Sequence, residues 1–168
     1  MKMMLFNVLR WAPLAVFLWF MRSGAGGVDW RMAYLTAGGL GVVVLLMDIV
    51  TRRIEPLYLG TNLWLISGAV LYLVEFWTSL GWYARLGSGS LFAWVALTSL
   101  GVCLWIVLRG RNGRKDSAIF FGASVVALGI AVACGGSVFM GGTLSFMGLL
   151  VLQQLLARGR ERALQRAS

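Results

Sequence analysis

The sequence predicts an all-α, polytopic transmembrane helical bundle of six spans, or five if the first apolar run does not cross, with its C-terminus in the cytoplasm. Of the 168 residues, 60% are hydrophobic, and the mean hydropathy is +0.83. A soluble domain cannot bury so large an apolar fraction, so the surroundings of this chain are expected to be lipid. We expect residues 1–168 to form a single integral-membrane helical domain, ending in a basic cytoplasmic tail at 157–168.

A helical hairpin over residues 40–80 organises the predicted fold. Two apolar spans, expected at 31–50 and 57–80, flank the short sequence TRRIEP. Each run is long enough to cross a bilayer, and so short a connection forces the two helices to be antiparallel neighbours. The arginines of this turn, Arg52 and Arg53, place it on the cytoplasmic side.

The first apolar run, residues 3–21, has three interpretations because it contains Asn7, Arg10 and Pro13. In one interpretation the run is a true span, with Arg10 extending toward the cytoplasmic headgroups. It is otherwise a short helix that enters the membrane without crossing. A cleaved signal peptide is the third interpretation, which Arg22 directly after the run and the lack of an A-x-A site disfavour.

Three further apolar runs complete the predicted bundle. We expect these spans at 90–108, 117–134 and 137–156. The connections between spans are expected to be a glycine-rich loop at 23–30, a loop with interfacial aromatics at 81–89, a polybasic loop at 109–116 and a tight turn at Gly135–Gly136.

The distribution of basic residues predicts the orientation. In the six-span arrangement, twelve of the lysines and arginines fall on one side of the membrane, and only Arg22, Arg31 and Arg85 fall on the other. An excess of basic residues in short loops marks the cytoplasmic side of a membrane. The tail at 157–168 lies on that side, and the N-terminus joins it only if the first run crosses.

The sequence offers little that could carry catalysis. Histidine is absent, which excludes imidazole ligation of metal or haem and histidine-based acid–base chemistry. No phosphate loop, metal-ligand cluster or nucleophile triad is visible. We therefore expect no catalytic residues, no metal and no cofactor. A membrane enzyme acting on lipid would need several polar residues in one cavity, which the sequence does not supply.

Two carboxylates, Asp48 and Glu75, fall within predicted spans and are the candidate intramembrane ionisable residues. Asp48 lies four residues before Arg52, so it is either half of an interfacial ion pair or a proton or cation site. Glu75 lies about five residues inside the predicted end of its span. It either reaches headgroup level, toward Arg85, or forms a titrating or substrate-binding site.

Basic loops are the second group of candidate residues. The net charge of +9 would suggest nucleic acid in a soluble protein, but here the arginines lie between spans, so we expect no nucleic-acid partner. Anionic lipid headgroups are the expected partners, each contact contributing roughly 1 kcal/mol. The candidate lipid contacts are Arg52, Arg53, Arg109, Arg111, Arg114 and Lys115.

Rows of small residues at helical spacing predict close helix packing. The rows are Ala37 and Gly41; Ala123, Ala127 and Ala131; and Gly141, Ser145 and Gly148. Small side chains let neighbouring backbones approach each other in membrane bundles, so these rows indicate helix contacts and no ligand. We expect other membrane proteins, or a second copy of the chain, as partners.

The first 80 residues contain the pattern Pro13-Leu14-x-Val16-Phe17-x-x-Phe20, then Arg22, then Arg52-Arg53-Ile54-Glu55 and Gly68. In these residues the chain resembles the intracellular septation protein A family of bacterial inner-membrane proteins. The family has a longer polar segment before its last two spans than the RGRNGRKD of this chain. The resemblance implies a non-enzymatic multi-pass protein that serves septation and envelope upkeep through membrane-protein contacts.

Two functional hypotheses follow. The first is a non-enzymatic inner-membrane protein of cell-envelope maintenance or septation that acts through membrane-protein contacts. The second is a small-solute or proton-coupled transporter, a channel or a substrate-binding membrane subunit that uses Glu75 and Asp48.

Overall fold

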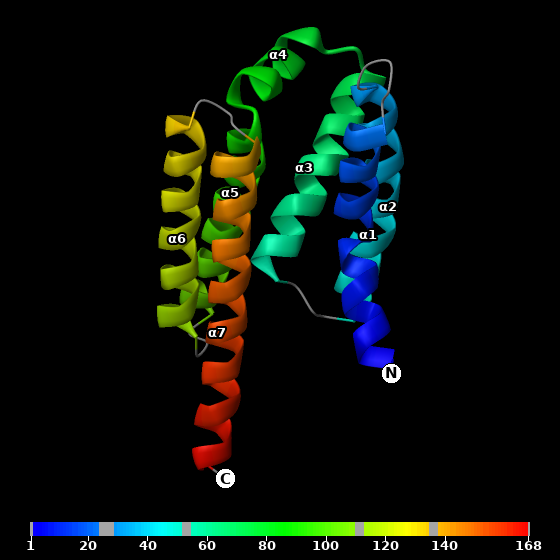
Figure 1. Cartoon of the computed structure of the whole chain (residues 1–168). Helices are drawn as coiled ribbons and strands as arrows, with labels where there is room; N and C mark the ends of the chain where they lie inside the picture. The colour runs from blue at the N-terminus through cyan, green and yellow to red at the C-terminus, as the bar shows by residue number, and fades with distance from the viewer. Residues whose placement is uncertain (1, 24–28, 52–54, 110–112, 135–137, 168) are drawn as a thin grey trace. The chain divides into compact units, whose positions relative to one another are not determined.

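The computed structural model describes residues 2–23, 29–51, 55–109, 113–134 and 138–167, and every element in these ranges is helical (Figure 1). The elements are α1 (Lys2–Ser23), α2 (Trp30–Val50), α3 (Pro56–Leu73), α4 (Trp77–Leu86), α5 (Ser88–Leu108), α6 (Arg114–Ala133), the π-helix η1 (Val138–Thr143) and α7 (Leu144–Ala167).

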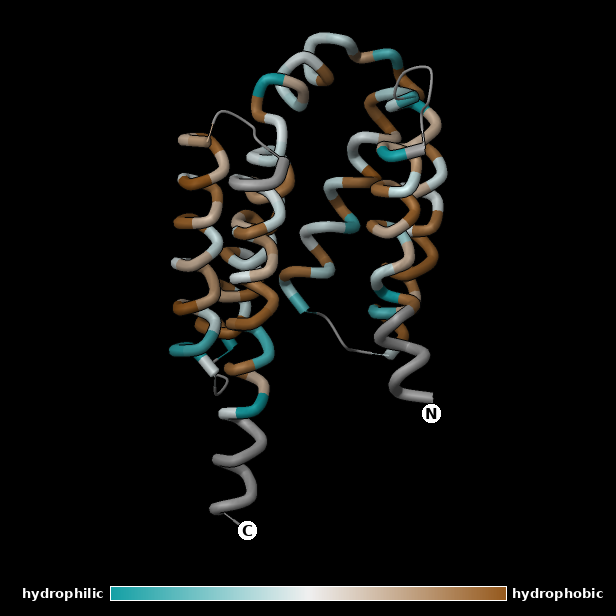
Figure 2. Tube along the Cα trace, in the orientation of Figure 1, coloured by the Kyte–Doolittle hydropathy of each residue, from teal (hydrophilic) through white to brown (hydrophobic). Residues whose placement is uncertain are grey.

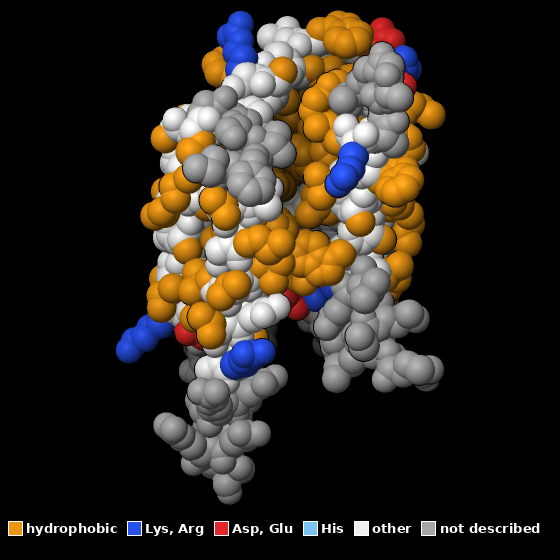
Figure 3. Space-filling model, in the orientation of Figure 1, with side chains coloured by type: hydrophobic (Ala, Val, Ile, Leu, Met, Phe, Trp, Pro, Cys, Tyr) orange, Lys and Arg blue, Asp and Glu red, His pale blue; other side chains and the backbone are white. Residues whose placement is uncertain are grey.

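Four of the described helices are long and apolar enough to cross a membrane: α2, α3, α5 and α6. They are 18 to 21 residues long, which corresponds to about 27–32 Å at 1.5 Å per residue. Large apolar side chains on their outward faces are well exposed, as at Val43 (60%) and Val126 (62%). Figures 2 and 3 show apolar residues along these helices and over most of the described surface in view. The composition of this surface is that of a membrane protein.

The predicted positions of three helices are confirmed within a few residues. Helices α2, α5 and α6 occupy the runs expected at 31–50, 90–108 and 117–134. The run expected at 137–156 is divided, because its first turns form η1 and the rest belongs to α7. Helix α7 also continues through the region predicted as a basic tail.

The predicted span 57–80 is wrong at its C-terminal end. Helix α3 stops at Leu73, and Glu75 has a φ of 53°, in the left-handed region. The backbone N–H of Phe76 then donates to the carbonyl oxygen of Leu71 at 3.0 Å, which closes the helix end in the manner of a Schellman motif. The residues from Trp77 onward start the separate helix α4, so the expected loop at 81–89 is also wrong.

The chain divides into two compact units, Met1–Arg85 and Leu86–Ser168, which are described separately. In the first unit, α2 and α3 pack antiparallel; Ala37 and Gly41 of the predicted row are buried on α2, but the closest approaches are at Gly38 and Gly68, which lie outside the row. A Cβ atom added to Gly38 would lie 2.7 Å from the Cβ of Ala69, and one added to Gly68 would lie 2.3 Å from the ring of Tyr34. Both glycines are therefore required by close approach of neighbouring groups.

Aromatic rings fill the end of the first unit away from Arg10. The ring of Phe17 on α1 lies 4.9 Å from that of Tyr34 and 5.0 Å from that of Trp64. Tyr34 also contacts Trp30 and Tyr72. Trp64 is therefore a core residue, and α1 is joined to both α2 and α3 by these contacts.

In the second unit, α6 packs between α5 and α7. A Cβ added to Gly141 would lie 3.0 Å from the Cα of Ala131, so η1 approaches the α6 backbone closely. The predicted row continues from η1 into α7, where a Cβ added to Gly148 would meet nothing within 4 Å. The row therefore marks a close helix contact at Gly141 but not at Gly148. The buried hydroxyls of Ser99 and Ser124 donate to carbonyl oxygens of their own helices, which satisfies them without a neighbouring helix.

Candidate functional site

The most unusual group of side chains in the first unit is a cluster of three charged residues, Arg10, Asp48 and Glu55. The Nε of Arg10 donates to Asp48 Oδ1 at 2.8 Å, and its Nη1 donates to Glu55 Oε1 at 2.6 Å. The three residues come from α1, the last turn of α2 and the start of α3. One guanidinium therefore joins three consecutive helices at one end of the unit.

The start of α3 explains why Glu55 is available to Arg10. Glu55 is the N-cap residue of α3, but its side chain makes no hydrogen bond to its own helix. Pro56 occupies the first helical position. A backbone N–H at this position would have no acceptor within the helix, so proline removes no hydrogen bond there. Glu55 is extended, with φ −113° and ψ 129°, as expected for a residue before proline. Its carboxylate accepts a hydrogen bond from Arg10 on α1.

Arg10 is buried, contrary to the expectation that it extends toward the headgroups. Its side chain is 2% exposed, and that of Asp48 is 5% exposed, whereas the side chain of Glu55 remains 41% exposed. The guanidinium carbon also lies 4.8 Å from the centre of the Tyr58 ring, which contacts Trp11 edge-on. Charge pairing and a cation–π contact together compensate for removing this cation from water.

Asp48, a candidate from the sequence, is thus part of this cluster. The sequence suggested Arg52 as its partner through the i,i+4 spacing, and Arg52 lies outside the described residues. The partner that the structure shows is Arg10, which is 38 residues away in the chain. No sequence spacing points to a pair at that separation. The available signal is Arg10 itself, because an arginine inside an apolar run must reach either the headgroups or a buried counter-ion.

Glu75, the other candidate, lies apart from the cluster at the far end of α3. It is exposed, and it sits in the connection between α3 and α4 instead of inside a span. Its left-handed backbone favours glycine, and a non-glycine residue there is disfavoured by about 1 kcal/mol or more. The structure therefore does not bring Asp48 and Glu75 together.

Replacing Glu75 with glycine is expected to raise the free energy of unfolding by about 1 kcal/mol, because glycine adopts the left-handed conformation without steric cost. Unfolding in detergent micelles titrated with SDS measures the change. The matched control is Glu75→Gln, which removes the charge and keeps the strain, so it should leave stability unchanged. A glycine variant that is less stable than the wild type would show that the carboxylate makes a compensating contact.

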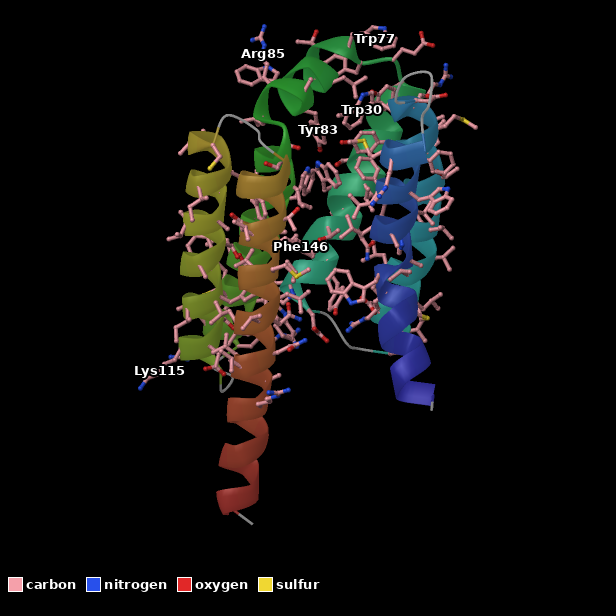
Figure 4. The ribbon with its side chains drawn as sticks, in the orientation of Figure 1. Trp30, Trp77, Tyr83, Arg85, Lys115 and Phe146 are labelled. Carbon is pink, nitrogen blue, oxygen red and sulfur yellow. The ribbon has the colours of Figure 1, made fainter. Side chains whose placement is uncertain are left out.

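The basic candidates lie at helix ends. Arg109 follows α5, and its guanidinium carbon lies 5.0 Å from the ring of Trp105. Arg114 and Lys115 are exposed in the first turn of α6, as Figure 4 shows for Lys115. Arg52, Arg53 and Arg111 lie outside the described residues. The described members are thus placed at the ends of candidate spans, where headgroup contact is expected.

A buried amide, Asn62, was not predicted from the sequence. Asn62 on α3 is 2% exposed, and its Nδ2 has no acceptor among the described protein atoms. It lies one helical turn after Tyr58 and beside α2, where its Oδ1 would be 3.5 Å from a Cβ added to Gly41. A buried donor without an acceptor costs roughly 1–3 kcal/mol.

Replacing Asn62 with leucine is therefore expected to raise the free energy of unfolding by about 1–3 kcal/mol. The control is Thr61→Val, which removes a buried hydroxyl that donates to the Leu57 carbonyl at 2.8 Å and should therefore lower stability slightly. Both are measured by SDS-driven unfolding. If the leucine variant is the less stable of the two, the amide has a partner that the protein atoms do not provide.

The geometry of the cluster suits helix joining better than chemistry. Within the described residues, no group of three or more His, Cys, Asp and Glu is placed to hold a metal ion. The two carboxylates of the cluster share one guanidinium, so each of them links its own part of the chain to α1. Buried charges held this way fix which helices meet and in which register.

The chain matches no protein-family model, no curated protein and no solved structure. The resemblance to the septation proteins therefore stays a prediction from the residues quoted above. The function is argued below from the cluster, the packing and the candidate spans.

Proposed function

We propose that this protein is a non-enzymatic, multi-pass protein of the bacterial inner membrane that serves septation or envelope maintenance by binding other membrane proteins. The observation that carries the proposal is the use of Asp48. This carboxylate sits within a candidate span, where an ionisable residue by default suggests a transport or proton site. It is instead held by Arg10 at 2.8 Å, in a contact that joins α1 to α2.

The contacts of α1 support counting it as the first span. It packs on α2 from the Arg10–Asp48 pair to the ring contact of Phe17 with Trp30. With α1, the four candidate spans and a final span over η1 and the first half of α7, the chain would cross six times. The basic residues of the connections then favour a cytoplasmic C-terminus.

The resemblance supports the cellular role. It includes Phe17 and Gly68, two residues that pack against the same Tyr34 ring. It also includes Glu55, which belongs to the charged cluster. Residues that carry the resemblance therefore contribute to the packing of the first three helices, as expected for a protein whose role is to present a stable membrane surface.

Deletion of the gene in its host, followed by complementation, tests this function. We expect the deletion to cause defective septation or elongated cells. Wild-type protein and Arg22→Met should restore division, whereas Arg10→Met, which breaks the cluster, should not. Tagged wild-type protein isolated in native membrane discs should carry division or envelope-synthesis proteins. Normal division of the deletion strain, with the tagged chain isolated alone, would refute the proposal.

A second candidate, proton-coupled transport, is favoured by the composition of the cluster. Two carboxylates face one guanidinium, Glu55 remains partly exposed, and the unsatisfied Asn62 amide lies deeper in the same unit. This arrangement would offer a proton an entry point at Glu55.

Proton flux in liposomes tests the second candidate. Transport would require that Asp48→Asn abolish a flux that the wild-type protein supports. Glu75→Gln serves as the comparison, because Glu75 is exposed and lies beyond the end of α3 that is opposite the cluster. Absence of flux in the wild-type protein rules this candidate out.

A further inference from the structure

Helix α4 connects two candidate spans but cannot be a span itself. It follows α3, which has 18 residues, and precedes α5, which has 21. The ten residues of α4 correspond to about 15 Å, half of the hydrocarbon thickness, and they include Arg85. If α3 and α5 both cross, α4 must lie at the membrane boundary opposite the Arg10 cluster.

Two contacts set the direction of α4 relative to α3, one where α3 ends and one near the C-terminal end of α4. The hydrogen bond from Phe76 to Leu71 closes α3 and turns the chain. Further along, the Tyr83 hydroxyl lies 2.7 Å from the Oγ of Ser67 on α3. Leu80 is buried on the same side of α4. Figure 4 shows Tyr83 directed toward α3, with Trp77 and Arg85 directed away from it.

The free face of α4 combines large aromatic rings with one cation. Trp77 is 66% exposed, and Trp82 is 60% exposed. The guanidinium carbon of Arg85 lies 5.9 Å from the centre of the Trp82 ring. Among the described residues, no carboxylate forms an ion pair with Arg85. Exposed indoles beside an arginine are typical of segments that lie at headgroup depth, where one side of the ring is wet and the other apolar.

We propose that α4 is an in-plane helix that binds phospholipid headgroups. Arg85 pairs with lipid phosphate, and the rings of Trp77 and Trp82 lie at the boundary between headgroups and acyl chains. The charge of Arg85 is complementary to phosphate, and the exposed apolar area of both rings gains from leaving water. The inference rests on the candidate spans α3 and α5 and does not depend on a role in septation. The proposed orientation assigns this face to the outer leaflet.

Spin-label depth measurements test this proposal. Single cysteines are introduced at Thr78 and Gly81 of α4 in a background with Cys103→Ala and Cys134→Ala, and the protein is reconstituted into vesicles of phosphatidylethanolamine and phosphatidylglycerol. Relative access of oxygen and a water-soluble nickel complex reports depth. Val43, exposed in the middle of α2, provides the hydrocarbon reference, and Gly159, exposed in the C-terminal part of α7, provides the aqueous reference.

Labels on α4 should give depths between the two references. Arg85→Gln should shift the Gly81 label toward water, whereas Arg109→Gln, which removes a similar arginine–tryptophan contact after α5, should leave it in place. Aqueous values at both α4 positions, or hydrocarbon values equal to those at Val43, would overturn the inference. An aqueous value at Val43 would instead show that the spans themselves are not in the membrane, a failure distinct from that of α4.

Discussion

Replacing Arg10 with methionine is expected to lower the free energy of unfolding by about 3–5 kcal/mol, because it leaves the buried Asp48 carboxylate without its partner. Methionine keeps most of the length of the side chain, so the loss of unfolding free energy reports the missing charge pairing more than missing packing contacts. The change is measured by SDS-driven unfolding of the purified protein in micelles, followed by circular dichroism. Loss of this contact should also loosen the Arg10 end of α1, while the ring contacts of Phe17 with Tyr34 and Trp64 hold the other end.

Two companion variants separate charge pairing from other effects. Arg22→Met makes the same substitution in the same helix at an exposed position and should change stability by less than about 0.5 kcal/mol. Adding Asp48→Leu and Glu55→Gln to Arg10→Met should recover most of the loss, because a fully apolar replacement of a buried ion pair is often tolerated. An Arg10→Met protein as stable as the Arg22→Met protein would show that the cluster contributes little.

The second large effect is expected at Gly38, where α2 and α3 are closest. Gly38→Ala would place a methyl group 2.7 Å from the Cβ of Ala69 and 3.0 Å from the backbone oxygen of Leu65. Because part of this contact is backbone, the two helices must move apart, which should cost about 1–3 kcal/mol of unfolding free energy. The measurement is again SDS-driven unfolding.

Gly39→Ala is the matched control, since it is the same substitution one residue along the same helix. A Cβ at Gly39 meets nothing within 4 Å, and the better helix propensity of alanine should leave this variant unchanged or stabilise it by up to about 1 kcal/mol. Equal stability of the two alanine variants would contradict the close approach of α2 and α3.

The apolar runs predicted most of the helices because long hydrophobic segments leave few alternatives in lipid. Helices α2, α5 and α6 begin and end within a few residues of the expected runs. The close packing of α2 and α3 was likewise visible in the small residues around Ala37 and Gly41. These features depend on local composition, which a sequence displays directly.

The break between α3 and α4 was not predictable in the same way. Neither glycine nor proline occurs between Leu71 and Trp77, and the run remains apolar except for Glu75. Composition and helix propensity therefore predicted a continuous helix. The actual break places Glu75 in the left-handed conformation, which glycine usually occupies. The break is accompanied by tertiary contacts of α4, such as that of Tyr83 with Ser67, which local sequence does not display.

The charged cluster could be predicted only in part. Asp48 was identified as a candidate, but its partner lies in another helix, and Glu55 was noted only as part of the turn predicted on the cytoplasmic side. Such a contact depends on how three helices pack, and hydropathy does not report packing. Arg10 was the available clue, because a cation in an apolar helix needs either the headgroups or a buried counter-ion.

Membrane insertion with the arginine-bearing connections inside the cell is the central claim, and a labelling experiment tests it most directly. Single cysteines at Gly81 on α4 and at Lys115 in the first turn of α6 are exposed to a membrane-impermeant maleimide in intact cells whose chain lacks Cys103 and Cys134. We predict labelling at position 81 in intact cells and labelling at position 115 only after the membrane is opened. The reverse pattern, or equal labelling of both in intact cells, would contradict the proposed topology.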